Sequence, residues 1–121
     1  MKILSIDTSS NLCAVAVLDN TNLIKENILD DTKNHSEKIM PVIAQTLKES
    51  NLNLENIDLI VCDKGPGSFT GIRIGVATVM SFVDSLEIPA IGISSLECLA
   101  YNALLNDSKS SGKCICLIAV L

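Results

Sequence analysis

The stretch IDLIVCDKGPGSFTGIRIGVATVMSFV, residues 57–83, decides the fold class. Residues 57–62 are a short apolar run that predicts a buried strand, and residues 65–71 (GPGSFTG) predict a sharp, glycine-rich turn. The apolar run that follows, to about Ser85, predicts a helix. A strand, a tight turn and a helix in this order indicate an α/β domain.

Three further strands are predicted before this stretch. Residues 2–7, 12–18 and 23–29 are apolar runs, and turn-forming residues separate them. Asp19-Asn20 predicts a hairpin turn between the second run and the third. Because the connections are tight, we expect these three strands to be antiparallel.

Two capping boxes predict where helices begin. Asn34 with Glu37 begins one helix, and Ser94 with Glu97 begins another. Pro41 lies inside the first of these and should kink it, because its ring removes a helical hydrogen bond. The apolar positions of this helix are Ile39, Met40, Ile43, Ala44 and Leu47.

A short strand at 90–93 and a helix to about Leu105 complete the order β-β-β-α-β-α-β-α. An antiparallel opening with a parallel remainder is the arrangement of the ribonuclease H-like, actin-like ATPase domain, an α/β fold with a mixed sheet. We expect this domain at 1–107, a linker at 108–113, and at 114–121 the first strand of a second domain that is largely missing.

Composition limits the function classes. Nine basic residues against 14 acidic ones give a net charge of −5, and aromatics are 2%, so direct binding of nucleic acid by this chain is not expected. MKILSID, residues 1–7, is not a signal peptide, and the apolar stretch 72–83 is too short to span a bilayer. We therefore expect a cytoplasmic protein. All five cysteines lie in apolar runs, which predicts buried, reduced thiols: Cys13, Cys62, Cys98, Cys114 and Cys116.

Two segments have the residue types of a phosphate or metal site. Asp7 ends a strand and hydroxyl side chains follow it, so the carboxylate can hold a hydrated metal while the hydroxyls meet phosphate; alternatively, these residues only terminate the strand. Residues 65–71 place a helix N-terminus after glycines, but they match neither phosphate-loop motif. The alternative is a turn that lets the helix approach its neighbours closely. Lys64 and Arg73 flank this turn, as phosphate contacts or as solvated charges.

The helix after the turn has almost no polar face. Because only one side of it can lie on a sheet, we interpret the rest as a protein–protein interface, with coverage by the second domain as the alternative. Gly71 and Gly75 form a notch that would admit another helix. His35 is the only histidine, which excludes a two-histidine metal site in this chain and predicts a surface or capping residue.

Three segments carry a resemblance to a known family. MKILSIDTSS (1–10), NHSEKIMP (34–41) and KGPGSFTGIRIG (64–75) resemble, in this order and spacing, the glycoprotease-like TsaB/YeaZ family of tRNA threonylcarbamoyladenosine biosynthesis proteins. The resemblance implies an actin-like fold with a degenerate nucleotide cleft. It also implies a non-catalytic scaffold or activating subunit for threonylcarbamoyl transfer to tRNA adenosine, which acts by dimerising with a TsaD-like paralogue.

The resemblance also implies site residues. A vestigial nucleotide site would comprise Asp7, Thr8, Ser9 and Gly67. The partner interface would comprise Ile39, Ile43, Gly71, Gly75, Thr78 and Val79. No catalytic residue and no metal ligand is expected.

The expected partners and cofactors follow from the same resemblance. The chain would pair with the TsaD-like paralogue or with itself, a TsaE-like ATPase would join the larger complex, and tRNA would bind only through that complex, without a membrane. No cofactor is required, with at most weak ATP or ADP and Mg²⁺. The alternative function is an ATP-binding, actin- or hexokinase-like ATPase or small-molecule kinase half-site that uses Asp7. A peptidase is not expected, because no nucleophile motif is present.

Overall fold

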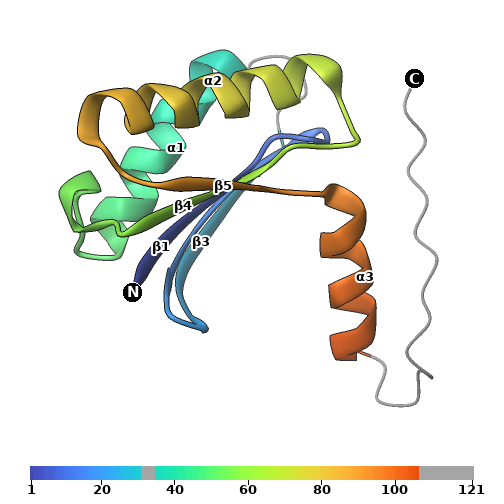
Figure 1. Ribbon diagram of the computed structural model, residues 1–121, viewed down its shortest axis with the longest axis horizontal. Coiled ribbons are helices and arrows are strands. Elements are labelled where there is room, and N and C mark those ends of the chain that lie inside the picture. The colour runs from blue at the N-terminus through green and yellow to red at the C-terminus, as the bar shows by residue number, and fades with distance from the viewer. Residues whose placement is uncertain (31–34, 107–121) are drawn as a thin grey trace.

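A computed structural model describes residues 1–30 and 35–106, which form one mixed sheet and its helices (Figure 1). The strands are β1 (Lys2–Asp7), β2 (Leu12–Asp19), β3 (Asn22–Asp30), β4 (Leu59–Asp63) and β5 (Ala90–Ile93). The helices are α1 (His35–Glu49), the 3₁₀ turn η1 (Leu54–Asn56), α2 (Phe69–Leu86) and α3 (Ser95–Asn106). The predicted order of elements and the ribonuclease H-like fold class are confirmed.

The strand order in the sheet is β3-β2-β1-β4-β5. β1 pairs with β2, and β2 with β3, in antiparallel fashion, whereas β4 is parallel to both β1 and β5. Ile6 of β1 is level with Cys62 of β4. Asp7 and Asp63 therefore end two adjacent parallel strands at the same edge of the sheet.

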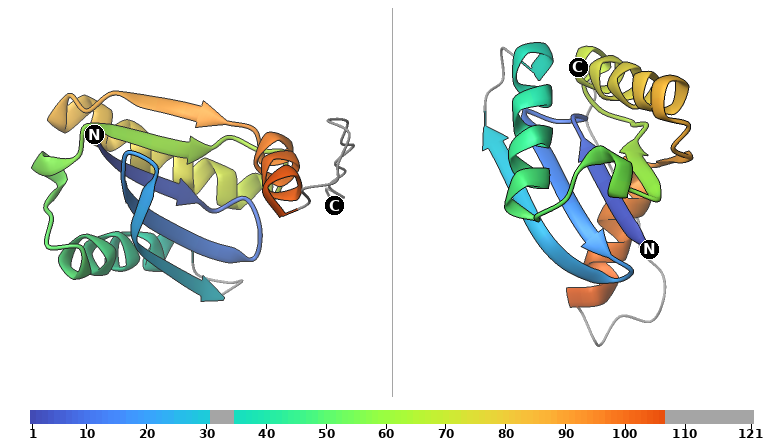
Figure 2. Two further views of the ribbon diagram at one scale, coloured as in Figure 1. Left: turned by 90° about the horizontal axis from the view of Figure 1, so that it is seen from below. Right: turned by 90° about the vertical axis from the view of Figure 1, so that its left-hand side faces the viewer.

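The core lies between the sheet and the two helices α1 and α2. The right-hand view of Figure 2 shows these helices on one side of the sheet and α3 on the other. Alternate residues of β1 and β2 point into this core, as the period of a strand requires. The largest fully buried side chains include Leu4, Ile6, Val15, Val17, Ile39, Ile43 and Ile60.

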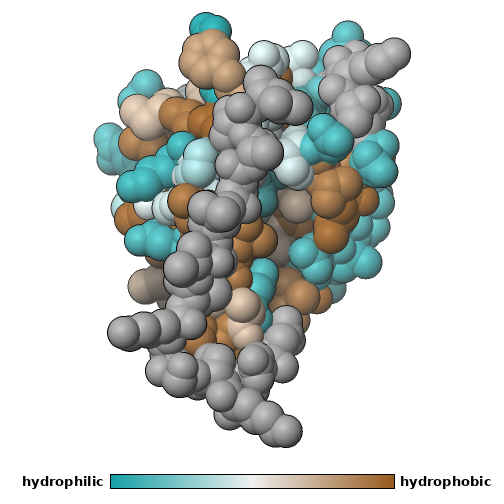
Figure 3. Space-filling view, turned by 90° about the vertical axis from the view of Figure 1, so that its right-hand side faces the viewer, coloured by the Kyte–Doolittle hydropathy of each residue, from teal (hydrophilic) through white to brown (hydrophobic). Residues whose placement is uncertain are grey.

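The second face of the sheet is only partly covered in the described part of the chain. Leu18, Leu59 and Val61 are half-buried there, and Ile91 is exposed. Figure 3 views the molecule from the side on which α3 lies, and hydrophobic surface is visible between hydrophilic side chains. The exposed large apolar residues of α3 are Leu99, Tyr101, Leu104 and Leu105.

Several local predictions need correction. The hairpin turn is at Asn20-Thr21, one residue later than expected, and Asn20 adopts a φ of 54° there. Met40 and Ala44, which were expected on the apolar face of α1, are exposed. Val42 and Thr46 are buried there instead.

Cys98 is exposed, although its apolar neighbours predicted a buried thiol; Cys13 and Cys62 are buried as expected. Cys98 lies on α3, where only Ser95 among residues 95–105 is buried, so an apolar run does not guarantee burial on this helix. The Ser94–Glu97 capping box is confirmed. The Ser94 hydroxyl accepts a hydrogen bond from the Leu96 N–H, and Glu97 Oε2 accepts one from the Ser94 N–H.

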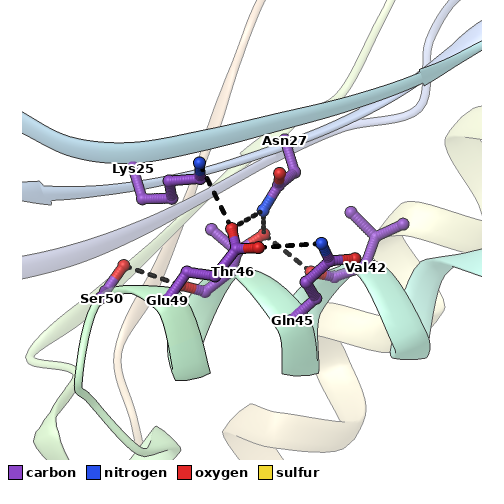
Figure 4. A network of polar contacts seen from close by, with 7 residues as sticks. All are labelled: Lys25, Asn27, Val42, Gln45, Thr46, Glu49 and Ser50. Carbon is purple, nitrogen blue, oxygen red and sulfur yellow. Dashed lines mark hydrogen bonds and ion pairs between the residues drawn. The ribbon is translucent and has the colours of Figure 1, made fainter.

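A polar network fixes the C-terminal half of α1 to β3 (Figure 4). Asn27 Nδ2 on β3 donates to Thr46 Oγ1 and to Glu49 Oε2, each at 3.0 Å, and Lys25 lies 3.4 Å from the same carboxylate. Hydrogen bonds from Gln45 and from Asn27 lower the pKa of Glu49. The network attaches α1 directly to β3.

Some predictions fall outside the described residues. They are the Asn34 part of the first capping box, the linker at 108–113, the strand at 114–121 and the burial of Cys114 and Cys116. By length and composition alone, α2 is long and apolar enough to cross a membrane, because the helix extends beyond the predicted 72–83 stretch. The same helix packs Val79 and Phe82 into the core against the sheet.

Truncating a core residue tests the assignment of the two sheet faces. Leu4 is fully buried on β1 and Leu23 is 57% exposed on β3. We expect Leu4→Ala to lower the free energy of unfolding by about 3 kcal/mol, because it leaves a cavity. Leu23→Ala, the matched control, should change it by less than about 1 kcal/mol in the same urea titration. Equal effects would contradict the assignment.

Candidate functional site

Asp7 and Ser9 form a closed hydrogen-bonded turn at the end of β1. Asp7 Oδ1 accepts a hydrogen bond from the Ser9 N–H at 2.8 Å and another from Ser9 Oγ at 2.6 Å. This arrangement terminates a strand in the manner of an Asx turn. The carboxylate oxygen that it occupies therefore has a structural partner.

Asp63 is a member of this site that the sequence analysis missed. It is 7% exposed, and its Oδ1 accepts hydrogen bonds from the Gly65 N–H at 2.7 Å and from Ser95 Oγ at 2.5 Å. Its Oδ2 lies 3.3 Å from Ser9 Oγ, which also donates to Asp7. Asp63 ends a strand that is parallel to and adjacent to the strand that ends at Asp7, and this pairing brings it into the site.

Thr8 is buried and contacts α2. It is 1% exposed, and its Oγ1 donates to the Gly71 carbonyl oxygen at 2.6 Å. A Cβ added at Gly71 would lie 2.0 Å from the Thr8 carbonyl oxygen, and one added at Gly75 would lie 2.4 Å from Thr8 Oγ1. The notch predicted for another helix is thus filled by Thr8 of this chain.

The loop before α2 packs equally closely on Ser9. The Ser68 N–H donates to the Ser9 carbonyl oxygen at 2.6 Å, and a Cβ added at Gly67 would lie 2.3 Å from that oxygen. Ser68 Oγ caps α2 by accepting a hydrogen bond from the Gly71 N–H at 3.2 Å. These contacts support the second interpretation of residues 65–71, a turn that lets α2 approach its neighbours.

The structure brings all four predicted nucleotide-site residues together: Asp7, Thr8, Ser9 and Gly67. The Thr8 hydroxyl donates to the Gly71 carbonyl oxygen, and the Ser9 hydroxyl donates to Asp7. The two hydroxyl groups that were expected to meet a phosphate therefore already have partners within the chain. Weak nucleotide binding at this site remains a prediction.

The six predicted interface residues lie on α1 and α2, but five of them are buried within this chain: Ile39, Ile43, Gly71, Gly75 and Val79. Thr78 is half-buried, and its hydroxyl donates to the Ile74 carbonyl oxygen. The single chain does not test whether any of the six contacts a partner. The outward apolar residues on the same helices are others, and they include Met40, Ala44, Phe69, Val76 and Met80.

Three charged or titratable side chains near the site have local roles. His35 is 8% exposed rather than a surface residue, and its Nε2 lies 3.1 Å from the Ser10 carbonyl oxygen. The Arg73 guanidinium lies over the Phe69 ring, 5.2 Å from its centroid. The exposed Lys64 packs its methylene groups beside Gly92, as expected for a solvated charge.

Metal-ligand clusters and thiol reactivity can be compared with the described residues. Among residues 1–30 and 35–106, no group of three or more His, Cys, Asp or Glu side chains is placed to hold a metal ion. Burial, with smaller contributions from the charges of Asp63 and Asp7, raises the pKa of the Cys62 thiol to about 11. A thiol with this pKa is protonated at neutral pH and is a poor nucleophile.

The comparisons with known proteins agree on one group. A family model described as "TsaD: tRNA N6-adenosine threonylcarbamoyltransferase" matches residues 22–119. The protein named tRNA threonylcarbamoyladenosine biosynthesis protein TsaB from Bacillus subtilis is 42% identical over 102 residues, which cover 84% of this chain and 44% of that protein. The protein of the same name from Escherichia coli K12 is 35% identical over 103 residues, 85% of this chain and 44% of that protein.

The solved structures give the same result for the fold. YeaZ from Pseudomonas aeruginosa superposes with a TM-score of 0.80 at 30% identity, over 86% of this chain and 48% of that one. RuvC from Thermus thermophilus shares the fold alone, with a TM-score of 0.56 at 10% identity, over 93% of this chain and 74% of that one. The chain spans about half the length of the curated TsaB relatives it matches.

Adding a methyl group at Gly71 tests the contact with Thr8. In a helix, Gly→Ala ordinarily stabilises by about 1 kcal/mol. Here we expect Gly71→Ala to lower the free energy of unfolding by about 2 kcal/mol or more, because the new Cβ meets the Thr8 carbonyl. The measurement is urea unfolding followed by circular dichroism.

Gly92→Ala is the matched control. Its Cβ would meet only the side chain of Lys64, at 3.1 Å from Cδ, and that side chain can move. We expect a change within about 1 kcal/mol. Stabilisation by Gly71→Ala would contradict the contact. For the same steric reason Gly75→Leu should unfold the domain, so it cannot serve as a test of pairing.

Proposed function

Because the chain belongs to the TsaB/YeaZ family, we propose that it is a non-catalytic scaffold or activating subunit in the biosynthesis of threonylcarbamoyladenosine in tRNA. In this proposal it acts in the cytoplasm by pairing with a TsaD-like paralogue, the subunit that transfers the threonylcarbamoyl group. It also pairs with itself when the paralogue is absent. A TsaE-like ATPase belongs to the larger complex, and tRNA contacts this chain only through that complex.

The observation that carries the proposal is the outward apolar surface of α1 and α2. Met40 is 48% exposed, Met80 is 49% exposed and Val76 is 38% exposed, and the two helices contact each other on one face of the sheet. Apolar surface of this kind on a soluble domain favours a protein contact. Met side chains also adapt readily to a partner surface.

A groove beside α1 adds to this surface. It encloses about 630 Å³ and is lined by α1 residues from Met40 to Lys48 and by the segment Asn51–Glu55. It lies away from Asp7 and Asp63. The groove thus shares Met40 with the proposed pairing surface. Asp7 and Asp63, by contrast, accept hydrogen bonds from the Ser9 and Gly65 N–H groups.

The absence of a catalytic role for this chain is part of the proposal. Asp7 and Asp63 accept hydrogen bonds from neighbouring hydroxyl and amide groups, and the Cys62 thiol is protonated at neutral pH. We propose that the transfer chemistry takes place on the paralogue. The net charge of −5 is consistent with tRNA being held elsewhere in the complex.

Pairing can be tested by light scattering after size exclusion, with the chain alone and with the TsaD-like paralogue of the same organism. We expect a one-to-one complex with the paralogue. Met40→Glu together with Met80→Glu should weaken it at least about tenfold, because two charges enter a desolvated apolar contact.

Leu105→Glu is the control for this pair. Leu105 is 65% exposed on α3, on the other side of the sheet, so the substitution places a single new carboxylate at an exposed apolar position without touching α1 or α2. Pairing should be unchanged. A wild-type chain that stays monomeric in both runs, or a double variant that pairs normally, would contradict the proposal.

Nucleotide binding separates this function from the kinase or ATPase half-site. We expect titration calorimetry with Mg-ATP to show at most weak binding, with a dissociation constant no tighter than about 1 mM. The physical reason is that the Ser9 hydroxyl already donates to Asp7, and the Ser68 and Gly71 N–H groups already donate to the Ser9 carbonyl oxygen and to Ser68 Oγ. Micromolar binding that Asp7→Ala abolishes would favour the half-site instead.

A further inference from the structure

Thr8 connects two sets of residues that the sequence treats as separate sites. It was expected to face a nucleotide, and Gly71 was expected to face a partner helix. Instead, the Thr8 hydroxyl donates to the Gly71 carbonyl oxygen at 2.6 Å, and Thr8 is 1% exposed. The end of β1 and the first turn of α2 therefore form one contact.

The contact leaves α2 no freedom to move toward β1. Gly71 and Gly75 are one helical turn apart, and each faces a different part of Thr8, the carbonyl oxygen and the side-chain hydroxyl. The positions where their Cβ atoms would lie are within 2.0 and 2.4 Å of those oxygens. Backbone and side chain are thus packed without any intervening atom.

A second attachment joins Ser9, the residue after Thr8, to the turn that precedes α2. The Ser68 N–H donates to the Ser9 carbonyl oxygen at 2.6 Å, and Gly67 packs on the same oxygen. Further along the helix, Val79 lies in the core. Because a helix behaves as a rigid rod over this length, these contacts set its position along the sheet.

The outward side of α2 presents Val76 and Met80, and α1 presents Met40. Asn27 and Glu49 hold α1 on β3 without any contribution from Thr8. The spacing between the apolar residues of the two helices thus depends on where Thr8 seats α2. We propose that Thr8 is a positioning residue for partner binding: its hydrogen bond to Gly71 sets the position of α2 that the partner recognises. This inference rests on the proposed function.

The test compares three variants of the 121-residue chain. Thr8→Val keeps the shape of the side chain and removes the hydroxyl donor, whereas Thr8→Ser keeps the donor. Ser95→Ala is the matched control, since it removes another buried hydroxyl bond at the same edge of the sheet, and the acceptor of that bond is Asp63 on β4 rather than a residue of α2. Each variant is measured for its affinity to the TsaD-like paralogue by sedimentation and for its stability by urea unfolding.

We expect Thr8→Val to weaken pairing by about tenfold, and Thr8→Ser and Ser95→Ala to stay within about twofold of the wild type. Hydrogen exchange should rise in the first two turns of α2 in Thr8→Val alone. This pattern supports the inference, because Ser95→Ala loses stability without losing affinity.

Two outcomes overturn the inference while the proposed function stands. One is Thr8→Val pairing as tightly as the wild type. The other is Ser95→Ala losing as much affinity as Thr8→Val, since pairing would then follow stability alone. A wild-type chain that pairs with neither the paralogue nor itself overturns both, and the wild-type run by itself reveals that case.

Discussion

The close approach of α2 to the end of β1 is the constraint on which the rest of the structure depends. Thr8 lies against Gly71 and Gly75, and Ser9 lies against Gly67 and Ser68, with hydrogen bonds of 2.6 Å at both places. Three positions without a Cβ are needed for this, which explains a glycine at every one of them. With α2 seated here, its Val79 and Phe82 reach the core, and its remaining apolar residues are left facing outward.

The same constraint changes what the carboxyl edge of the sheet can do. In an open α/β sheet the carboxyl ends of the strands are where ligands bind. Here Asp7 and Asp63 meet at that edge, but the hydroxyl groups of Ser9 and Ser95 and the Gly65 N–H bond to them. A buried carboxylate needs such donors in the absence of a cation. Oδ1 of each carboxylate therefore has hydrogen-bond donors within the chain, and these bonds stabilise the turns at this edge.

Much of the fold could be predicted from the sequence because it depends on local periodicity. The apolar runs of β1 and β2, the glycine-rich turn and the Ser94 capping box are all visible within a few neighbouring residues. What could not be predicted depends on packing between distant segments. Asp63 belongs to the site only because β4 lies beside β1, and the apolar neighbours of Cys98 gave no indication that α3 is poorly covered.

The candidate site divides in the same way. The resemblance grouped residues 7–9 with Gly67, and the structure places the two segments in contact at one edge of the sheet. What contacts the glycines was not predictable, because Gly71 and Gly75 have the same sequence whether a partner helix or the chain's own Thr8 packs against them. Because Thr8 fills the notch, the proposed pairing involves the glycines only through the position of α2, and the proposed contact surface consists of side chains such as Met40 and Met80. A residue buried at one end of a helix can then control recognition at the helix's opposite face.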